Sequence, residues 1–173
     1  MRSQVEQARQ RLLGAWHEWL ACQRVLLFED HPFQGKMLLH QLKQVGLKQC
    51  SWQKGDPREV ATCAREPWDL MICDLWLGGE DLLSCLESWK DSETRAPLWL
   101  LSGQESQVLQ SIADLLSRQG WPVVAATSKP VDEQGIKRVL LFHYLSQTLR
   151  SQTRFIQSGG SATGMVMRRG AIF

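Results

Sequence analysis

Acidic, hydroxyl and basic side chains stand at the ends of short apolar runs in this sequence. Glu29 and Asp30 follow one run, Asp74 follows another, Ser102 closes a third, and Lys129 comes just after the last. Three carboxylates that lie close together raise one another's pKa unless a cation sits among them. Such hard oxygen ligands suit Mg2+, which keeps waters and often bridges to phosphate. A carboxylate beside such a cation and an ammonium is suited to accept a phosphoryl group, whose charge the metal and the lysine neutralise.

The elements that must position these side chains alternate along the chain. Short apolar runs rich in Val, Ile, Leu and Trp are typical of strands buried on both faces of a parallel sheet. Four such runs are residues 25–28, 70–73, 97–101 and 121–126, with a weaker candidate at 49–53. Helical spacing or helix-start signals fall between them, in 33–45, from Asp56-Pro57, in 82–89, in 108–116 and after Pro130.

Five alternations of strand and helix predict a doubly wound α/β fold with a parallel sheet. In such sheets, ligands bind outside the carboxyl ends of the strands, at the point where the strand order reverses. The polar residues that follow the apolar runs therefore converge on one site if the fold is correct. Each motif alone also fits an ordinary turn or a solvated strand end, and only their joint occurrence favours a site.

The chain from about Arg24 to Gln147 resembles a response-regulator receiver domain. The matching segments are VLLFED (25–30), LMICDLWL (70–77), LWLLSG (98–103) and SKP (128–130). The resemblance implies a (βα)5 flavodoxin-like, CheY-like sheet with strand order 2-1-3-4-5, here with an extra N-terminal helix. EDHPFQ (29–34) is similar to receivers that precede EAL-type cyclic-di-GMP phosphodiesterase domains. Only about 25 residues follow the receiver segment, so we expect a stand-alone receiver.

The resemblance also implies roles for individual residues. Asp74 would be the phosphoacceptor, Ser102 the hydroxyl switch and Lys129 the contact to the phosphoryl group. The Mg2+ ligands would be Asp30 directly, Glu29 mainly through water, Asp74, and the backbone carbonyl of Trp76. A sensor histidine kinase or phosphotransfer protein would supply the phosphoryl group to this two-component module. The chain would catalyse only its own phosphorylation and dephosphorylation, and would signal by binding an unknown downstream protein.

The sequence departs from the receiver pattern near the predicted site. Gly78 replaces the usual proline of the loop after the phosphoacceptor, and Leu82 replaces a glycine, so we expect a more mobile loop. Ala126 replaces the aromatic residue that normally moves together with the hydroxyl. Trp76 places a large ring beside the site, and we predict slow, shielded loss of phosphate.

Two other function classes compete with the phosphoswitch. The first is a receiver-fold adaptor or dimerisation module that is not phosphorylated, which Ala126 and the altered loop favour. The complete set of acids together with Lys129 argues against it. The second is a phosphatase of the haloacid-dehalogenase type, which normally needs a second aspartate two residues after the first. Trp76 occupies that position, so we discount this class.

Composition and charge limit the setting in which the protein acts. There is no apolar run of about 18 residues and no signal-peptide pattern, so we expect a cytoplasmic protein that does not enter a membrane. Residues 24–149 hold 13 basic and 16 acidic residues, which does not favour direct DNA binding. Five cysteines without metal-type spacing predict free, mostly buried thiols: Cys22, Cys50, Cys63, Cys73 and Cys85.

The receiver segment 24–149 is flanked by two extensions. Residues 1–23 predict a helix whose apolar positions, from Val5 to Cys22, follow a weak heptad pattern. This apolar stripe must be buried against another protein surface. We hypothesise a homodimer through residues 2–23, with docking on the receiver of the same chain as the alternative. Residues 150–173 are basic and rich in glycine towards the end, and we expect them to be flexible; the alternative is a short partner-binding peptide.

Overall fold

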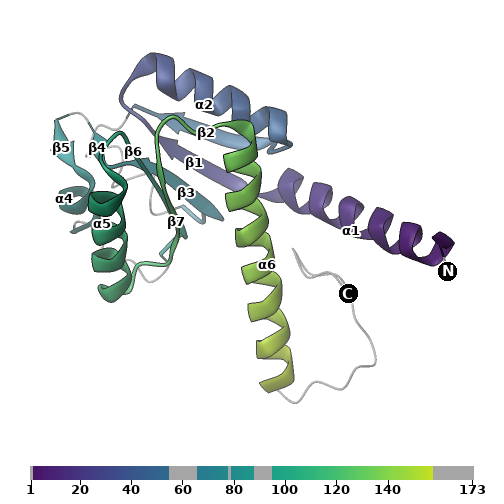
Figure 1. Ribbon diagram of the computed structural model, residues 1–173. Coiled ribbons are helices and arrows are strands. Elements are labelled where there is room, and N and C mark those ends of the chain that lie inside the picture. The colour runs from purple at the N-terminus through teal and green to yellow at the C-terminus, as the bar shows by residue number, and fades with distance from the viewer. Residues whose placement is uncertain (1, 55–65, 78, 88–94, 158–173) are drawn as a thin grey trace.

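The computed structural model describes residues 2–54, 66–77, 79–87 and 95–157 (Figure 1). Its centre is a parallel sheet of five strands in the order β2-β1-β3-β6-β7. The strands are β1 (Arg24–Phe28), β2 (Gln49–Gln53), β3 (Leu70–Asp74), β6 (Leu98–Ser102) and β7 (Val123–Ser128). Counted along the chain, these five strands have the order 2-1-3-4-5, so the predicted doubly wound α/β fold is confirmed. A separate antiparallel pair consists of β4 (Trp76–Leu77) and β5 (Glu80–Asp81).

Helices cover both faces of the sheet. The core on one face includes side chains of α4 (Leu82–Glu87) and α5 (Ser106–Arg118). The core on the other face includes side chains of α1 (Arg2–Cys22), α2 (Pro32–Val45) and α6 (Glu133–Gln157). The apolar residues of β1 and β3 are buried, which explains why their sequences read as continuous apolar runs.

Local signals in the sequence explain the bounds of α2. His31 is its N-cap and accepts a hydrogen bond from the backbone N–H of Gln34, and Pro32 occupies the first turn. Gly46 ends the helix with φ of 119°, a left-handed conformation that favours glycine. The helix therefore starts two residues after Asp30, and it brings its first turn to the carboxyl end of the sheet.

The N-terminal helix α1 docks on α6 of the same chain through its last two turns. The Trp16 ring lies 5.6 Å from the Tyr144 ring, and Trp19 Nε1 donates a hydrogen bond of 3.0 Å to Gln147 Oε1. Trp19 and Leu20 are buried. Docking in cis therefore accounts for the C-terminal part of α1, while the earlier part of the helix projects away from the sheet (Figure 1).

Three predictions from the sequence are not reproduced as stated by the described residues. The helix expected from Asp56-Pro57 lies outside the described residues. Helix α6 continues to Gln157, past residue 149 where the receiver was expected to end, and the rest of the expected flexible tail lies outside the described residues. Trp121, expected in a strand, lies just before β7 and is buried.

Within the described residues, every helix is too short or too polar to cross a bilayer.

Candidate functional site

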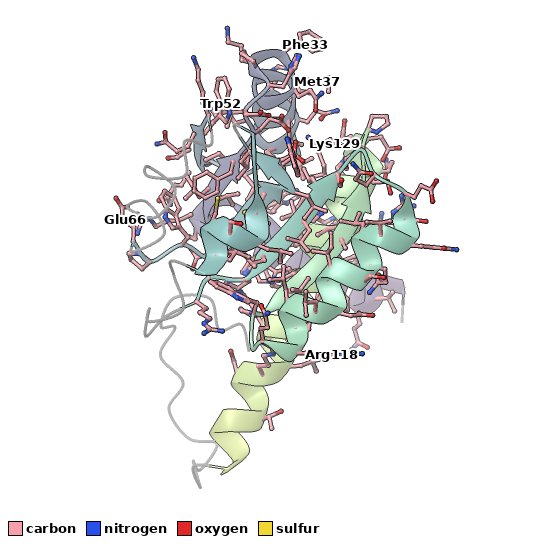
Figure 2. The ribbon with its side chains drawn as sticks, turned by 90° about the vertical axis from the view of Figure 1, so that its left-hand side faces the viewer. Phe33, Met37, Trp52, Glu66, Arg118 and Lys129 are labelled. Atoms are coloured by element: carbon pink, nitrogen blue, oxygen red, sulfur yellow. The ribbon has the colours of Figure 1, made fainter. Side chains whose placement is uncertain are left out.

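The carboxyl ends of four neighbouring strands bring the candidate residues to one edge of the sheet. Strands β1, β3, β6 and β7 are all parallel, with Phe28 paired to Cys73 and Asp74 paired to Leu101. Glu29 comes directly after β1, and Lys129 directly after β7. Figure 2 shows Lys129 at the same end of the molecule as Phe33 and Met37 of α2, away from Arg118 at the end of α5.

Lys129 binds both of the acids that lie nearest to it. Its Nζ lies 2.5 Å from Glu29 Oε2, 2.6 Å from Asp74 Oδ2 and 3.0 Å from Gln34 Oε1. An ammonium has three N–H donors, so these contacts use all of them. Burial alone lowers the pKa of Lys129, but the hydrogen bonds to Asp74 and Glu29 outweigh it, and the net pKa is raised. Lys129 therefore stays charged and holds Asp74 and Glu29 together.

Glu29, Asp30 and Asp74 form a compact cluster of acids. One oxygen of each carboxylate lies within 4.8 Å of the others, and Glu29 is only 1% exposed. Three carboxylates and one ammonium leave a formal charge of about −2, which a divalent cation would balance. Hard carboxylate oxygens on one open side of a sheet fit Mg2+, which keeps waters in its shell. The predicted acids are therefore together, and their chemistry fits the predicted metal.

Two supporting residues of the acid cluster were missed by sequence reasoning. Trp52 Nε1 donates a hydrogen bond of 2.9 Å to the backbone carbonyl oxygen of Glu29, and Gln34 accepts from Lys129. A Cβ added to Gly35 would overlap the indole ring of Trp52, so the ring lies directly on the first turn of α2. The available sequence signal for this contact was Gly35, a glycine inside a predicted helix, together with Trp52 on the weakest strand candidate.

Asp74 is also held by the segment that follows it. The backbone N–H of Trp76 donates to Asp74 Oδ1 at 3.3 Å, while Lys129 binds the other carboxylate oxygen. The Trp76 side chain is 60% exposed and lines the hollow above the acids. The loop expected to be mobile contains the short β4–β5 pair, in which Trp76 pairs with Asp81. Gly78 lies outside the described residues.

Ser102 links the site to the segment after β7 that contains Lys129. It is buried, and its Oγ accepts a hydrogen bond of 3.0 Å from the backbone N–H of Gln104. Its carbonyl oxygen accepts from the backbone N–H of Lys129 at 2.7 Å. Ala126 of β7 packs against the core on the α4 and α5 face, where the usual aromatic side chain is missing.

A hollow of about 900 Å3 lies over the acids and extends on both sides of the sheet edge. Its polar part is lined by the candidate residues Glu29, Asp30, Asp74, Ser102 and Lys129. Its apolar part includes side chains of α2 and α5, among them Phe33, Met37, Val108 and Ile112. All the sequence-predicted site residues therefore line one space that is open to solvent.

Comparison with known proteins gives the fold a family context. No family model matches the sequence. No curated protein matches it either. A response regulator from Colwellia psychrerythraea is similar in structure, with 22% identity, a TM-score of 0.59, and coverage of 72% of this chain and 97% of the other. A CheY-like receiver domain from Methylobacillus flagellatus has 16% identity, a TM-score of 0.57, and coverage of 70% and 98%.

A third similar structure contains a metal ion. It is the receiver domain of a sensor histidine kinase from Pseudomonas aeruginosa, with a magnesium ion coordinated in its active site cleft. It has 21% identity, a TM-score of 0.55, and coverage of 68% of this chain and 93% of the other. The finer similarity to receivers that precede EAL domains stays a prediction. On its sheet order and these neighbours, the chain has the CheY-like fold of response-regulator receiver domains.

Proposed function

We propose that this chain is a phosphoacceptor receiver of a two-component system, with Asp74 as the residue that is phosphorylated. The observation that carries the proposal is the bridge from Lys129 Nζ to Asp74 and Glu29, at 2.6 and 2.5 Å, beside the three-acid cluster. A merely structural ion pair needs one acid for one lysine. The excess of carboxylates in an open hollow favours a site that takes a divalent cation and a phosphoryl group.

The chemistry follows from the partners of Asp74. One carboxylate oxygen attacks the phosphorus of a phosphohistidine or of a small phosphodonor, and the bond from phosphorus to the donor's leaving atom breaks. Lys129 then binds a phosphoryl oxygen in place of its present contact to Asp74. Asp30, Asp74 and the carbonyl of Trp76, with Glu29 mainly through water, would hold Mg2+, which would neutralise the charge on the phosphoryl oxygens. The leaving imidazole takes up a proton from water.

The signal would leave the site through Ser102 and β7. The Ser102 hydroxyl would donate to a phosphoryl oxygen, and a rotation of its Oγ towards that oxygen would break the hydrogen bond that Oγ now accepts from the backbone N–H of Gln104, which frees that backbone segment to move. Because the Ser102 carbonyl binds the N–H of Lys129, a shift of Ser102 is passed to the start of the segment before α6. A downstream protein, rather than DNA, would read the resulting surface, and no other substrate is turned over.

Reaction with a phosphodonor tests the proposal. The full chain is incubated with Mg2+ and acetyl phosphate, and intact mass spectrometry should show one added phosphoryl group. Fluorescence of the exposed Trp76 should change when Mg2+ and beryllofluoride are added. Asp74→Ala should abolish both signals, whereas Asp114→Ala, an exposed carboxylate on α5, should retain them. No adduct on the wild type would favour the alternative, an adaptor that is not phosphorylated.

A further inference from the structure

Helices α1 and α6 both extend beyond the sheet (Figure 1). Each carries a set of exposed apolar side chains. On α1, Val5 is 69% exposed and Leu12 is 66% exposed, with Leu13 beside them. On α6, four large apolar side chains are exposed: Leu141, Phe142, Leu145 and Leu149. Clustered exposure of this kind marks an interaction surface, unlike scattered single residues.

The exposed part of α1 continues a face that is already used for packing. Val5, Leu12, Trp16 and Trp19 are spaced by seven, four and three residues, so they lie on one side of the helix. Trp16 stacks on Trp19 at 5.4 Å, and both rings pack on Tyr144 of α6. Beyond Trp16, towards the N-terminus, α1 has left α6, and the same apolar face has no cover from its own chain in the described residues.

The exposed face of α6 lies on a different side from the one that binds α1. Leu141, Leu145 and Leu149 are spaced by four residues, which places them in one row along the helix. Ile136 and Leu140 are buried against the sheet, and Tyr144 and Gln147 contact α1. The docked end of α1 fixes its direction, so α1 cannot also reach the row of leucines on its own α6.

We propose that a second copy of this chain covers both faces. The exposed half of α1 from one copy lies along the leucine row of α6 in its partner, and the partner's α1 does the same in return. The two faces have the same length, because Val5–Leu13 and Leu141–Leu149 each span about 12 Å of helix. Reciprocal contacts close with two-fold symmetry and leave neither face exposed. This assigns the dimer contact to α1 against α6, in place of the α1–α1 coiled coil suggested by the heptad pattern.

The mass of the full chain in solution tests the proposal, and light scattering after gel filtration measures it. The wild type at about 100 μM, a concentration at which micromolar dimers persist, should have twice the chain mass of 19.8 kDa. Leu12→Glu and Leu145→Glu, each alone, should halve the measured mass, because each places a charge in both reciprocal contacts. Gln7→Glu adds the same charge on an exposed part of α1 outside the apolar face, and should leave the dimer intact.

Several results would overturn this assignment. A monomeric wild type would do so, and so would a dimer that survives Leu145→Glu but not Leu12→Glu, since that pattern means an α1–α1 coiled coil. Circular dichroism checks that both variants remain folded, which we expect because Leu12 is 66% exposed and Leu145 is about half exposed. The measurement needs neither Mg2+ nor a phosphodonor, so its failure is separate from a failure of the proposed phosphoacceptor function.

Discussion

Trp52 on the edge strand β2 holds the backbone of Glu29, the acid that Lys129 binds. Its indole N–H donates a 2.9 Å hydrogen bond to the Glu29 carbonyl oxygen, and its ring covers Gly35 at the start of α2. The Glu29 carboxylate is in turn bound by Lys129 and by the backbone N–H of His31. The position of the acid pair therefore depends on a side chain that binds a backbone oxygen of Glu29 and does not line the hollow.

Replacing Trp52 with phenylalanine should weaken metal binding. The variant loses one hydrogen bond to the Glu29 backbone, which stabilises the fold by about 1 kcal/mol. Loss of a residue that orients metal ligands typically costs at least about tenfold in affinity. We expect Mg2+ to bind about tenfold more weakly by isothermal titration calorimetry.

Trp99→Phe is the matched control for this prediction. Trp99 Nε1 donates a bond of 3.0 Å to Thr127 Oγ1, within the core on the α1, α2 and α6 face to which Trp52 also belongs. The control should lose comparable stability and keep its Mg2+ affinity. Equal Mg2+ affinities in the Trp52 and Trp99 variants would show that Trp52 has no role in positioning the acids.

Gly35→Ala should destabilise the protein, against the usual trend for helices. Alanine within a helix is normally more stable than glycine by about 1 kcal/mol. Here the new Cβ would overlap the Trp52 ring, and overpacking costs about 1–3 kcal/mol. Gly14→Ala in α1 is the control, since a Cβ there meets no atom within 4 Å. Urea denaturation should lower the free energy of unfolding for the first and raise it for the second; a gain for both would mean that the ring moves away without cost.

The sequence alone predicts the strand-end residues of this site but not the contacts that support them. Glu29, Asp74, Ser102 and Lys129 could be placed together because parallel strands end at one edge, whatever their side-chain rotamers. The hydrogen bond from Trp52 to Glu29 depends on the pairing of β1 with β2 and on one rotamer of the indole ring. Neither is encoded in a local pattern.

The sequence predicts neither the end of α6 nor the short β4–β5 pair. The sequence predicts that the receiver segment ends at residue 149, yet no Gly or Pro occurs between Gly135 and Gly159, and α6 continues to Gln157. The β4–β5 pair was expected to be a mobile loop because of its glycines. Trp76 pairs with Asp81 although only two residues form each strand, which is too short for a period-2 pattern.

Removing the ammonium of Lys129 should destabilise the protein most when no metal is added. Lys129→Met leaves the buried Glu29 carboxylate without its cation, and breaking such a buried pair costs about 3–5 kcal/mol, less where water reaches the site. Mg2+ should restore part of the loss, because it neutralises the same acids. Lys137→Met breaks an exposed pair with Glu133 and should cost below about 1 kcal/mol. A loss of this small size for both variants in thermal unfolding would contradict the structural role of Lys129.

Trp76→Ala should shorten the lifetime of phosphorylated Asp74. The exposed Trp76 ring lines the hollow above the acids, where it hinders the approach of water to an acyl phosphate. Trp76→Phe keeps an aromatic ring there and should stay closer to the wild type. The decay of the phosphorylated mass after removal of the phosphodonor measures both rates. A half-life of Trp76→Ala equal to that of the wild type would refute shielding by this ring.

Acidification below neutral pH should destabilise the protein through His143. This side chain is buried where α6 meets the start of β3, and its Nε2 lies 3.2 Å from the Asp69 carbonyl oxygen and 3.0 Å from Gln147 Nε2. Burial lowers the pKa of His143 from its ordinary value of 6.5, outweighing the opposing effect of Asp69. The unfolded chain therefore binds a proton at a higher pH than the folded chain does.

The contribution of neutral, buried His143 to stability is fully present above its unfolded pKa of 6.5. It is lost as pH falls towards the lower pKa of the folded state. The slope is at most about 1.4 kcal/mol per pH unit for one proton. Urea denaturation at pH 7.5 and 5.5, on either side of the ordinary histidine pKa of about 6.5, should show a larger drop for the wild type than for His143→Gln. His40→Gln, on the exposed side of α2, should behave as the wild type does. If His143→Gln keeps the full pH dependence, groups other than the buried His143 cause the loss of stability at low pH.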